Sequence, residues 1–592
     1  MSEQAFKQGG GFIIEESGPQ DVLTPEDFSQ EQQMIRDTAA KFVAKEIQPV
    51  RGKIEKLDYP VIKSLLRQIG ELGFLGISVP EDLGGAGLDK VSALIADEEF
   101  GRAGSFSVTY GAHTGIGTLP IVYFGTPEQK KKYVPRLVSG ESAASFALTE
   151  PDCGSDALSL KTKAVLSPDK KYFILNGAKQ FISNGAIAEV FIVFAKIDGE
   201  KLSCFIVERG FEGVSIGPEE KKMGIKGSST TPVILTNVKV PVENLLGEAG
   251  KGTKIALNIL NNGRLKLSAG CLGASKGTFV NILEYVSQRK QFGKAINEFG
   301  MIREKLADMA IRIFALESAC YRTVGLIQRR VDGLNLPAAE REKGFLQAGH
   351  EYSIECAIMK VFGSEALDFV VDEGVQCLGG YGFIEEYPLE RAYRDSRINR
   401  IFEGTNEINR LVILGMLIKK SLCGELKLME AIRLVQKEMT ELGDKSGPGE
   451  GFLEGEKQAL SAAKKAFLLV AGAAAQKYGE ALEEEQELMG RLADCVIDIY
   501  VLESALLRAL KIAGAGGPEK AVLPASMVRI IAFEAVERIS GRLKESAAFI
   551  LAGDDLKILL GAIRRFTKTA PGNFRDLRRS IAKTMIEAGA YV

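Results

Sequence analysis

The spacing of hydrophobic positions changes along the chain. Over 28–56 and again over 59–75, apolar residues recur every three to four positions, which is typical of amphipathic helices. The residues before position 28 are mostly polar. The pattern therefore predicts an N-terminal extension over 1–27 and a mostly helical domain over 28–145.

Short runs typical of strands occupy the next part of the chain. They are rich in β-branched and aromatic residues and are separated by Gly, Asn, Asp and Pro. The runs are 173–177, 190–195, 202–207, 232–235 and 238–240. They predict a small antiparallel β domain over 146–250.

Helical spacing returns after the β runs. Long amphipathic helices with short links are expected over 252–287, 299–331, 338–365 and 366–379. Such helices pack as antiparallel bundles, so the sequence predicts a helical-bundle domain over 251–425. Glycines and charges at 443–449 indicate a linker, and it lies within an additional C-terminal helical domain over 426–592.

The order of these elements determines the expected fold class. Strands and helices do not alternate over any long stretch, so a doubly wound parallel sheet is not expected. The longest apolar run, 466–475, is about half of the ~20 residues that a membrane-spanning helix needs, and it indicates a buried helix. The expected class is mainly α with a small antiparallel β domain.

Composition narrows the chemistry. The 592 residues carry 75 Lys and Arg against 77 Asp and Glu, and this balance argues against a nucleic-acid binder. The two histidines, His113 and His350, are interpreted as structural, and their number excludes a His-rich zinc site. Eight scattered cysteines form no CxxC pair, so no metal is expected.

The two ends of the chain bear on localisation. The first residues resemble neither a secretory signal nor an Arg-rich transit peptide, so we expect a cytoplasmic protein of bacterial type. Basic residues gather between Arg564 and Lys583. A basic face attracts anionic lipid, so peripheral membrane contact is one interpretation, and a solvated face on a packed helix is the other.

Two motifs in the β region carry candidate chemistry. The loop 146–156 contains hydroxyls and a Gly-Ser turn whose amides can bind a ligand, although an ordinary Ser turn has the same composition. In KQFISNG, Phe181 and Ser183 stand two residues apart and are expected on one face of a strand. There the aromatic side chain can cover a planar ring. The alternative is a hairpin edge that turns at Asn184-Gly185.

Two more motifs follow the bundle helices. QCLGGYGF, from Gln376 to Phe383, indicates a helix C-cap and a tight loop that allows close approach of a cofactor. In IFEGTNEI, Glu403 follows two apolar residues and precedes a glycine. A carboxylate in such a loop can have a raised pKa and act as a base. The alternative is a solvated acid, with Thr405 capping the next helix.

Together these motifs resemble the acyl-CoA dehydrogenase family. TEPDCGSD, KQFISNG, RKQFG, QCLGGYGF and RIFEGTNEI follow the order and spacing of that family's signature segments over about 28–420. Asn261-Asn262-Gly263-Arg264, KKMGIKGSST and the helical tail are most similar to the very-long-chain branch, which has an additional C-terminal helical domain. One such motif is weak evidence, but five in register are specific.

The resemblance implies an activity and partners. The expected reaction is FAD-dependent α,β-dehydrogenation of a long-chain fatty acyl-CoA to trans-2-enoyl-CoA, the first step of β-oxidation. Electrons then pass to an electron-transfer flavoprotein. FAD is expected between the β domain and the bundle with help from a second subunit, in a homo-oligomer for which a dimer is favoured over a tetramer. An acyl-CoA oxidase and a family member acting mainly as an assembly or scaffold protein are the alternatives.

The same resemblance assigns residues, with Glu403 as the base that removes the α proton. The FAD contacts are Phe146, Leu148, Thr149, Gly154, Ser155, Phe181, Ile182, Ser183, Arg289, Gln291, Phe292, Gln376, Gly379, Gly380, Thr405 and Glu407. The substrate-side positions are Ser155, Asn261, Arg264 and Gly404. The chain departs from the family at Phe181, where Trp is usual, so packing on the flavin can differ. Another branch carries its base at the position of Gly263, and the glycine here favours Glu403.

Overall fold

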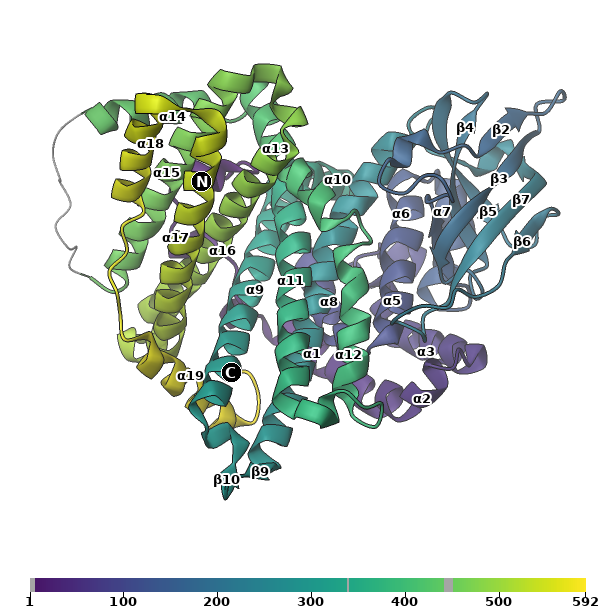
Figure 1. The fold of residues 1–592 in the computed structure, drawn as a ribbon. Coiled ribbons are helices and arrows are strands. Elements are labelled where there is room, and N and C mark those ends of the chain that lie inside the picture. The colour runs from purple at the N-terminus through teal and green to yellow at the C-terminus, as the bar shows by residue number, and fades with distance from the viewer. Residues whose placement is uncertain (1–5, 338–339, 441–450) are drawn as a thin grey trace.

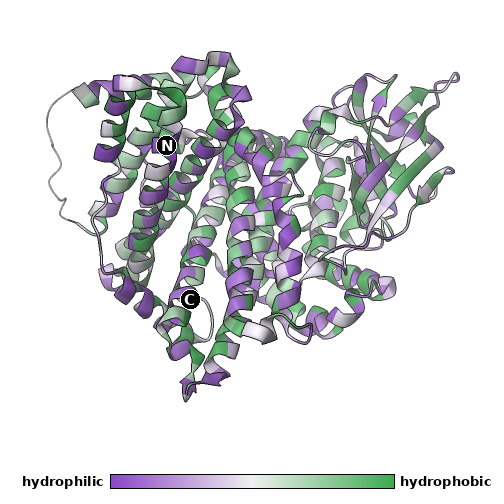
Figure 2. Cartoon of the chain, viewed as in Figure 1, coloured by the Kyte–Doolittle hydropathy of each residue, from purple (hydrophilic) through white to green (hydrophobic). Residues whose placement is uncertain are grey.

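The protein is mostly helical, with one large sheet at its edge. The computed structural model describes residues 6–337, 340–440 and 451–592, so the linker expected at 443–449 lies outside the described residues. Long helices form the centre, the sheet lies on one side and the last helices lie on the other (Figure 1). Along these helices apolar residues alternate with polar ones (Figure 2), as expected where one face of each helix is buried.

The N-terminal helices are shorter than the hydrophobic pattern predicted. They are α1 (Gln30–Phe42), α2 (Arg51–Ile54), α3 (Tyr59–Glu71), α4 (Lys90–Gly101), α5 (Ser105–Gly111), α6 (Leu119–Phe124) and α7 (Pro127–Val138). The continuous spacing over 28–56 is interrupted by a π-helical stretch, Val43–Ile47, and a 3-10 turn, Gln48–Val50. Pro49 in that turn has no N–H to donate to a helical ladder, which accounts for the interruption.

The β region forms one twisted sheet in which most neighbours are antiparallel. Its strands are β1 (Ala144–Ala147), β2 (Lys163–Leu166), β3 (Tyr172–Ser183), β4 (Val190–Ile197), β5 (Lys201–Glu208), β6 (Val214–Ile216), β7 (Thr230–Pro241) and β8 (Leu245–Leu246). Their order is β6-β7-β3-β2-β4-β5-β8, with β1 beside β4. Most neighbouring strands pair antiparallel, as predicted, whereas β4 pairs in parallel with both β1 and β2.

The bundle helices continue where the sequence suggested a break. They are α8 (Gly252–Gln288), α9 (Gly300–Gly333), α10 (Arg341–Glu351), α11 (Ser353–Leu378), α12 (Pro388–Ser396) and α13 (Asn406–Leu422). A small two-stranded ribbon, β9 (Lys290–Gln291) with β10 (Lys294–Ala295), links α8 to α9. The break predicted at residue 365 lies instead at Tyr352, whose ring is buried. The helix passes through Gly363, where the missing side chain lets α11 approach Ser268 of α8 closely.

The remaining helices extend the same core. They are α14 (Leu428–Thr440), α15 (Glu454–Tyr478), α16 (Gln486–Gly516), α17 (Val522–Ile550), α18 (Gly553–Phe566) and α19 (Phe574–Ala588). The run 466–475 is a largely buried part of α15, as predicted. No helix among residues 6–337, 340–440 and 451–592 is long and apolar enough to cross a membrane. The N-terminal segment joins this core, because Phe12 packs against Tyr500 of α16 with ring centroids 4.7 Å apart.

Candidate active site

Glu403 lies in a tight turn just before α13. Its φ is +59° and that of Gly404 is +82°; the left-handed conformation is uncommon for a glutamate. The amide of Asn409 holds the turn by donating to the carbonyls of Gly404 (2.8 Å) and Thr405 (3.0 Å). Thr405 caps α13 by accepting a hydrogen bond from the N–H of Ile408. The turn therefore directs the carboxylate away from α13.

The carboxylate points at a glycine of α8. A Cβ on Gly263 would lie 2.7 Å from Oε2 of Glu403, so a larger residue at position 263 would displace the carboxylate. Oε2 is shielded from solvent and has no hydrogen-bond partner among the described residues. A buried carboxylate oxygen without a partner is costly, so this arrangement indicates a functional group rather than a structural one.

Burial dominates the electrostatics of Glu403. It raises the pKa of this carboxyl from 4.5 to about 7, although Arg264 and Lys360 act in the opposite direction. Arg264 lies close, with Nε 3.4 Å from the carbonyl oxygen of Glu403 and Nη1 3.0 Å from Oδ1 of Asn261. Lys360 is fully buried and donates to Oδ1 of Asn406. Glu403 is therefore suited to accept a proton near neutral pH, and the interpretation of a solvated loop acid was wrong.

A long cavity of about 500 Å³ extends from Glu403. Its floor along α8 runs from Gly263 to Asn281, and these 18 steps of about 1.5 Å span about 27 Å. Small residues of α8 line it at Gly263, Gly270, Ala274 and Gly277. Apolar side chains make up much of the remaining wall: Val43, Phe100, Val108, Ile116, Leu267, Leu367 and Val371. Its shape suits a long apolar chain whose reacting end lies at Glu403.

The β domain contributes Ser183 to the same cavity. Phe181 is 61% exposed and has a φ of +58° at a register shift between Lys179 and Ile182. Phe181 and Ser183 are both more exposed than Ile182, which lies between them, so the exposure pattern agrees with their sharing one face of β3, although a bulge before Ile182 interrupts the regular pairing with β7. The hairpin alternative is wrong, since β3 pairs with β7 and β2 rather than with β4.

A buried ion pair fixes the loop that precedes β2. Nζ of Lys179 lies 2.7 Å from Oε1 of Glu150, whose carboxylate also accepts from Thr162 and from the N–H of Lys161. The loop is joined to β3 as well, because the N–H of Gln180 donates to the carbonyl of Thr149. Sequence reasoning missed this pair, although both residues lie inside the motifs that it singled out.

The remaining residues predicted in this loop differ in exposure. Leu148 is buried, and the ring of Phe146 packs on Phe194 with centroids 5.0 Å apart. Gly154 and Ser155 are exposed, and Ser155 is not part of the cavity lining.

A second hollow brings together another predicted set. Arg289, Gln291, Gln376, Gly379 and Gly380 line a cavity of about 530 Å³. The two glycines leave open space, since a Cβ on either one would meet nothing within 4 Å. Phe292, one residue beyond Gln291, is 93% exposed. Arg289 follows the last residue of α8 and stands 26 residues beyond Gly263, or about 39 Å along the helix, so within one chain this set lies far from Glu403.

The other predicted residues have clear environments. Asn261 and Arg264 are buried beside Glu403, whereas Glu407 is exposed on the first turn of α13. His113 is structural, as predicted, because its Nδ1 accepts from the N–H of Ala144 and its Nε2 lies 2.9 Å from the carbonyl of Leu137. Burial lowers its pKa to about 4. His350 is exposed on α10.

Sequence reasoning missed several charged residues near the cavity. Lys266 and Asp97 form an ion pair in its wall, and Lys360 is buried beside the loop of Glu403. The available signal was a charged residue on an apolar helix face, which is rarely left unpaired when buried.

Known proteins provide an independent comparison. Family models of the N-terminal, middle and C-terminal domains of acyl-CoA dehydrogenase match residues 29–141, 145–238 and 250–417. A further model, also described as an acyl-CoA dehydrogenase C-terminal domain, matches residues 462–565.

Individual relatives match over most of the chain. A probable acyl-CoA dehydrogenase of Bacillus subtilis (strain 168) is 50% identical over 585 residues, which cover 99% of this chain and 98% of the relative. The mitochondrial very long-chain specific acyl-CoA dehydrogenase of Homo sapiens is 38% identical, over 82% of this chain and 77% of the relative. A crystal structure of an acyl-CoA dehydrogenase complexed with FAD, from Bacillus anthracis, has a TM-score of 0.97 at 48% identity and covers 99% of this chain and 100% of that chain. The chain belongs to the acyl-CoA dehydrogenase family.

Proposed function

We propose that this protein catalyses the FAD-dependent α,β-dehydrogenation of long-chain fatty acyl-CoA to trans-2-enoyl-CoA, the first step of β-oxidation. The observation that carries the proposal is the unpartnered carboxylate of Glu403 at one end of a long cavity with largely apolar walls. Relatives of the very long-chain specific class support it.

The length of the cavity supports a long-chain substrate. The hydrocarbon core of a bilayer is about 30 Å thick and holds two fatty chains end to end, so one chain occupies about 15 Å of depth. The floor of about 27 Å along α8 exceeds this depth. Gly270 and Gly277 leave the cavity open along α8, because neither places a side chain in it.

The chain's own residues account for removal of the α proton. An α proton of a thioester is weakly acidic, and Glu403, with its pKa of about 7, accepts it near neutral pH. Arg264, held by Asn261, places a cation next to this loop. An acyl chain in the cavity excludes water and strengthens these interactions. This chemistry needs one carboxylate, which explains why the two histidines take no part.

The residues present fit a flavin. Ser183 reaches the cavity, and Phe181, two residues before it in β3, exposes its aromatic side chain. Arg289 and the open glycines at 379 and 380 suit phosphates and adenosine. When bound, FAD supplies the acceptor for the hydride that leaves the β carbon. Gly263, which adjoins Glu403, and Arg289 lie about 39 Å apart along the direction of α8, farther than one cofactor reaches. We therefore infer a homo-oligomer, with a dimer favoured, in which a second copy completes each site.

A chain-length series tests the proposal. The purified protein is expected to be yellow, and acyl-CoA substrates from butyryl to stearoyl are mixed with it without oxygen. Loss of flavin colour with palmitoyl-CoA, together with enoyl-CoA formation, supports dehydrogenation. A colourless protein would contradict it and favour the scaffold alternative.

The electron acceptor is tested in the same cuvette. We infer an electron-transfer flavoprotein as the partner, so recovery of colour on adding one is expected. Rapid recovery in air alone would favour an acyl-CoA oxidase.

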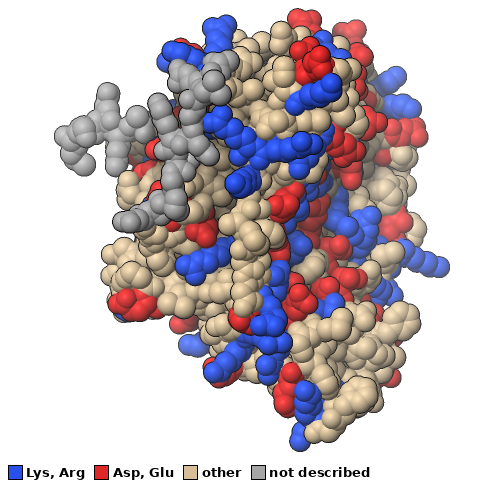
Figure 3. All heavy atoms as spheres, turned by 60° about the vertical axis from the view of Figure 1, so that its left-hand side comes forward, with Lys and Arg blue, Asp and Glu red and all other residues tan. Residues whose placement is uncertain are grey.

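The basic tail gives weaker support for membrane contact. Arg578 of α19 pairs with Asp308 and Glu534, and Lys583 pairs with Glu587. On the face shown in Figure 3, acidic and basic residues are intermixed. These pairs favour a solvated face on packed helices, so cytoplasmic localisation without stable membrane binding is the simpler proposal.

A further inference from the structure

A smaller hollow adjoins the far end of the long cavity. It measures about 320 Å³, and Ala40, Arg102 and Val280 line both spaces. Val280 is 17 residues beyond Gly263 on α8, or about 26 Å from the reacting end. Ala590 and Tyr591, which follow α19, form part of the wall of the smaller hollow. The last helical domain therefore reaches the distal end of the space assigned to the acyl chain.

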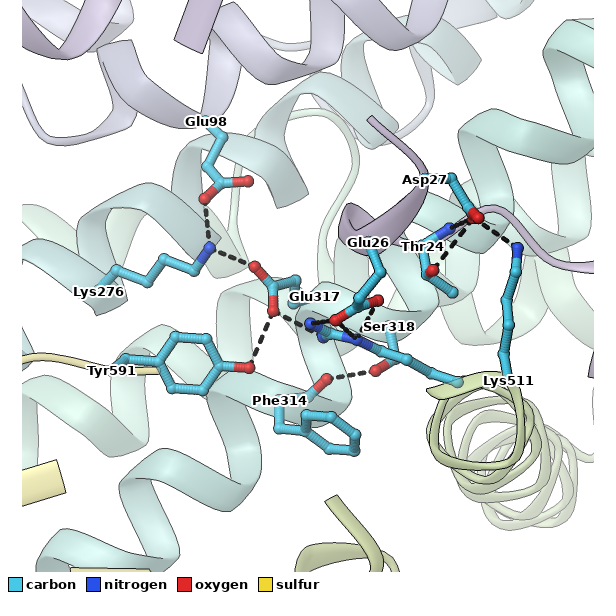
Figure 4. Close-up of polar contacts among 11 residues, drawn as sticks. Thr24, Glu26, Asp27, Glu98, Lys276, Phe314, Glu317, Ser318, Lys511 and Tyr591 are labelled. Atoms are coloured by element: carbon cyan, nitrogen blue, oxygen red, sulfur yellow. Dashed lines mark hydrogen bonds and ion pairs between the residues drawn. The ribbon is translucent and has the colours of Figure 1, made fainter. Parts of the chain in front are cut away.

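Charged residues line this hollow, and Figure 4 shows the polar contacts among several of them. Lys276 of α8 lies between two carboxylates, pairing with Glu98 of α4 at 2.6 Å and with Glu317 of α9. The hydroxyl of Tyr321 donates to Glu98 over 2.5 Å. Glu98, Glu317 and Tyr321 are all less than one-tenth exposed. The hollow is thus polar where the long cavity is largely apolar.

Tyr591 is attached to this network. Its hydroxyl donates to Oε2 of Glu317 over 2.8 Å, and Nζ of Lys276 lies 5.4 Å from the centre of its ring (Figure 4). Arg508 of α16 pairs with the same oxygen of Glu317 at 2.6 Å and also pairs with Glu26 of the N-terminal segment. Four separate parts of the chain, α8, α9, α16 and the N-terminal segment, therefore belong to the network that holds this aromatic ring at the wall.

We propose that Tyr591 and the charge network close the distal end of the acyl cavity, so that the additional C-terminal domain sets the longest chain accepted. The inference rests on the proposed function. Each acyl methylene that is buried strengthens binding about fourfold, so affinity rises with acyl length until the end of the acyl chain meets this wall. Beyond it, methylenes would enter a space lined by buried charges, which is unfavourable, and would collide with the ring of Tyr591.

The test compares substrate profiles of three variants as holoenzymes. Tyr591→Ala removes the ring, Tyr591→Phe keeps the ring but loses the hydroxyl, and Tyr478→Ala removes another tyrosine of the same domain, whose hydroxyl donates to the carbonyl of Phe549. The readout is kcat/KM for each chain length divided by kcat/KM for octanoyl-CoA. This ratio should fall once the acyl chain is too long for the cavity. We expect Tyr591→Ala to shift the acyl length at which the ratio begins to fall by at least two carbons upward. Tyr591→Phe and Tyr478→Ala should keep the wild-type profile.

The outcomes separate this inference from the proposed function. If no acyl-CoA reduces the flavin of the wild type, the proposed function fails. If the wild type is active and Tyr591→Ala keeps its profile, the inference alone is overturned. Should Tyr591→Ala lose flavin or unfold, Val280→Phe narrows the shared wall from the side of α8. It should shorten the longest accepted chain by at least two carbons, and an unchanged profile would overturn the inference.

Discussion

Glu403 should destabilise the folded protein when it is ionised. Its pKa is about 7 in the folded state against an ordinary 4.5, so the folded protein holds this proton to a higher pH than the unfolded chain does. Stability therefore falls as the pH rises from 4.5 to 7 and then levels off. At about 1.36 kcal/mol for each pH unit between 4.5 and 7, ionisation of Glu403 lowers the free energy of unfolding by about 3.4 kcal/mol. Because part of the side chain reaches solvent, we expect the measured loss in free energy of unfolding to be about 1–3 kcal/mol.

The substitution Glu403→Gln removes this cost while keeping the shape of the side chain. At pH 8 the variant should unfold at a higher denaturant concentration than the wild type. At pH 5 its gain in free energy of unfolding over the wild type should shrink to under about 1 kcal/mol. The matched control is Glu425→Gln, just after α13, where the carboxylate is exposed. Denaturant unfolding at both pH values, with equal flavin content, gives the comparison. An unchanged stability of Glu403→Gln at pH 8, or an equal gain in stability at both pH values, would show that ionised Glu403 does not destabilise the fold.

Three further changes test the site. Lys360→Met removes a cation that lowers the pKa of Glu403, so the rise of kcat/KM with pH should move to higher pH; an unmoved profile would show that Lys360 does not act on the base. Gly263→Ala places a Cβ 2.7 Å from Oε2 of Glu403 and should lower kcat by at least about 10-fold while flavin content stays normal, as the visible spectrum reports. Gly270→Leu fills the cavity floor and should abolish turnover of palmitoyl-CoA but spare butyryl-CoA; equal losses for both substrates would argue against a chain-binding role.

The sequence predicted those features that depend on local patterns. Helical spacing and strand-like runs predicted the element types, because each period reflects one buried face. The loop around Glu403 was identified as a candidate base from its apolar neighbours and a following glycine. Its burial was not predictable in the same way, because Gly263, 140 residues earlier, provides the space for the carboxylate.

Features that depend on tertiary contacts were missed or wrong. The bulge at Phe181 follows from pairing between β3 and β7, which periodicity does not reveal. Helix α11 continues past residue 365 and packs against α8 at Gly363, a contact that the spacing within one helix does not reveal. The depth of the cavity depends on α1, α4 and α8 lying together, and the hydrophobic pattern of any one of them contains no such information.

The central claim is that Glu403 is the base that removes the α proton. The most direct measurement is the rate at which palmitoyl-CoA bleaches the bound flavin in an anaerobic stopped-flow experiment, for the wild type, Glu403→Gln and Glu425→Gln. We predict a loss of at least about 100-fold for Glu403→Gln, the usual scale for removing a general base, and a near wild-type rate for Glu425→Gln. A Glu403→Gln rate within about 10-fold of the wild type, at equal flavin content, would contradict it.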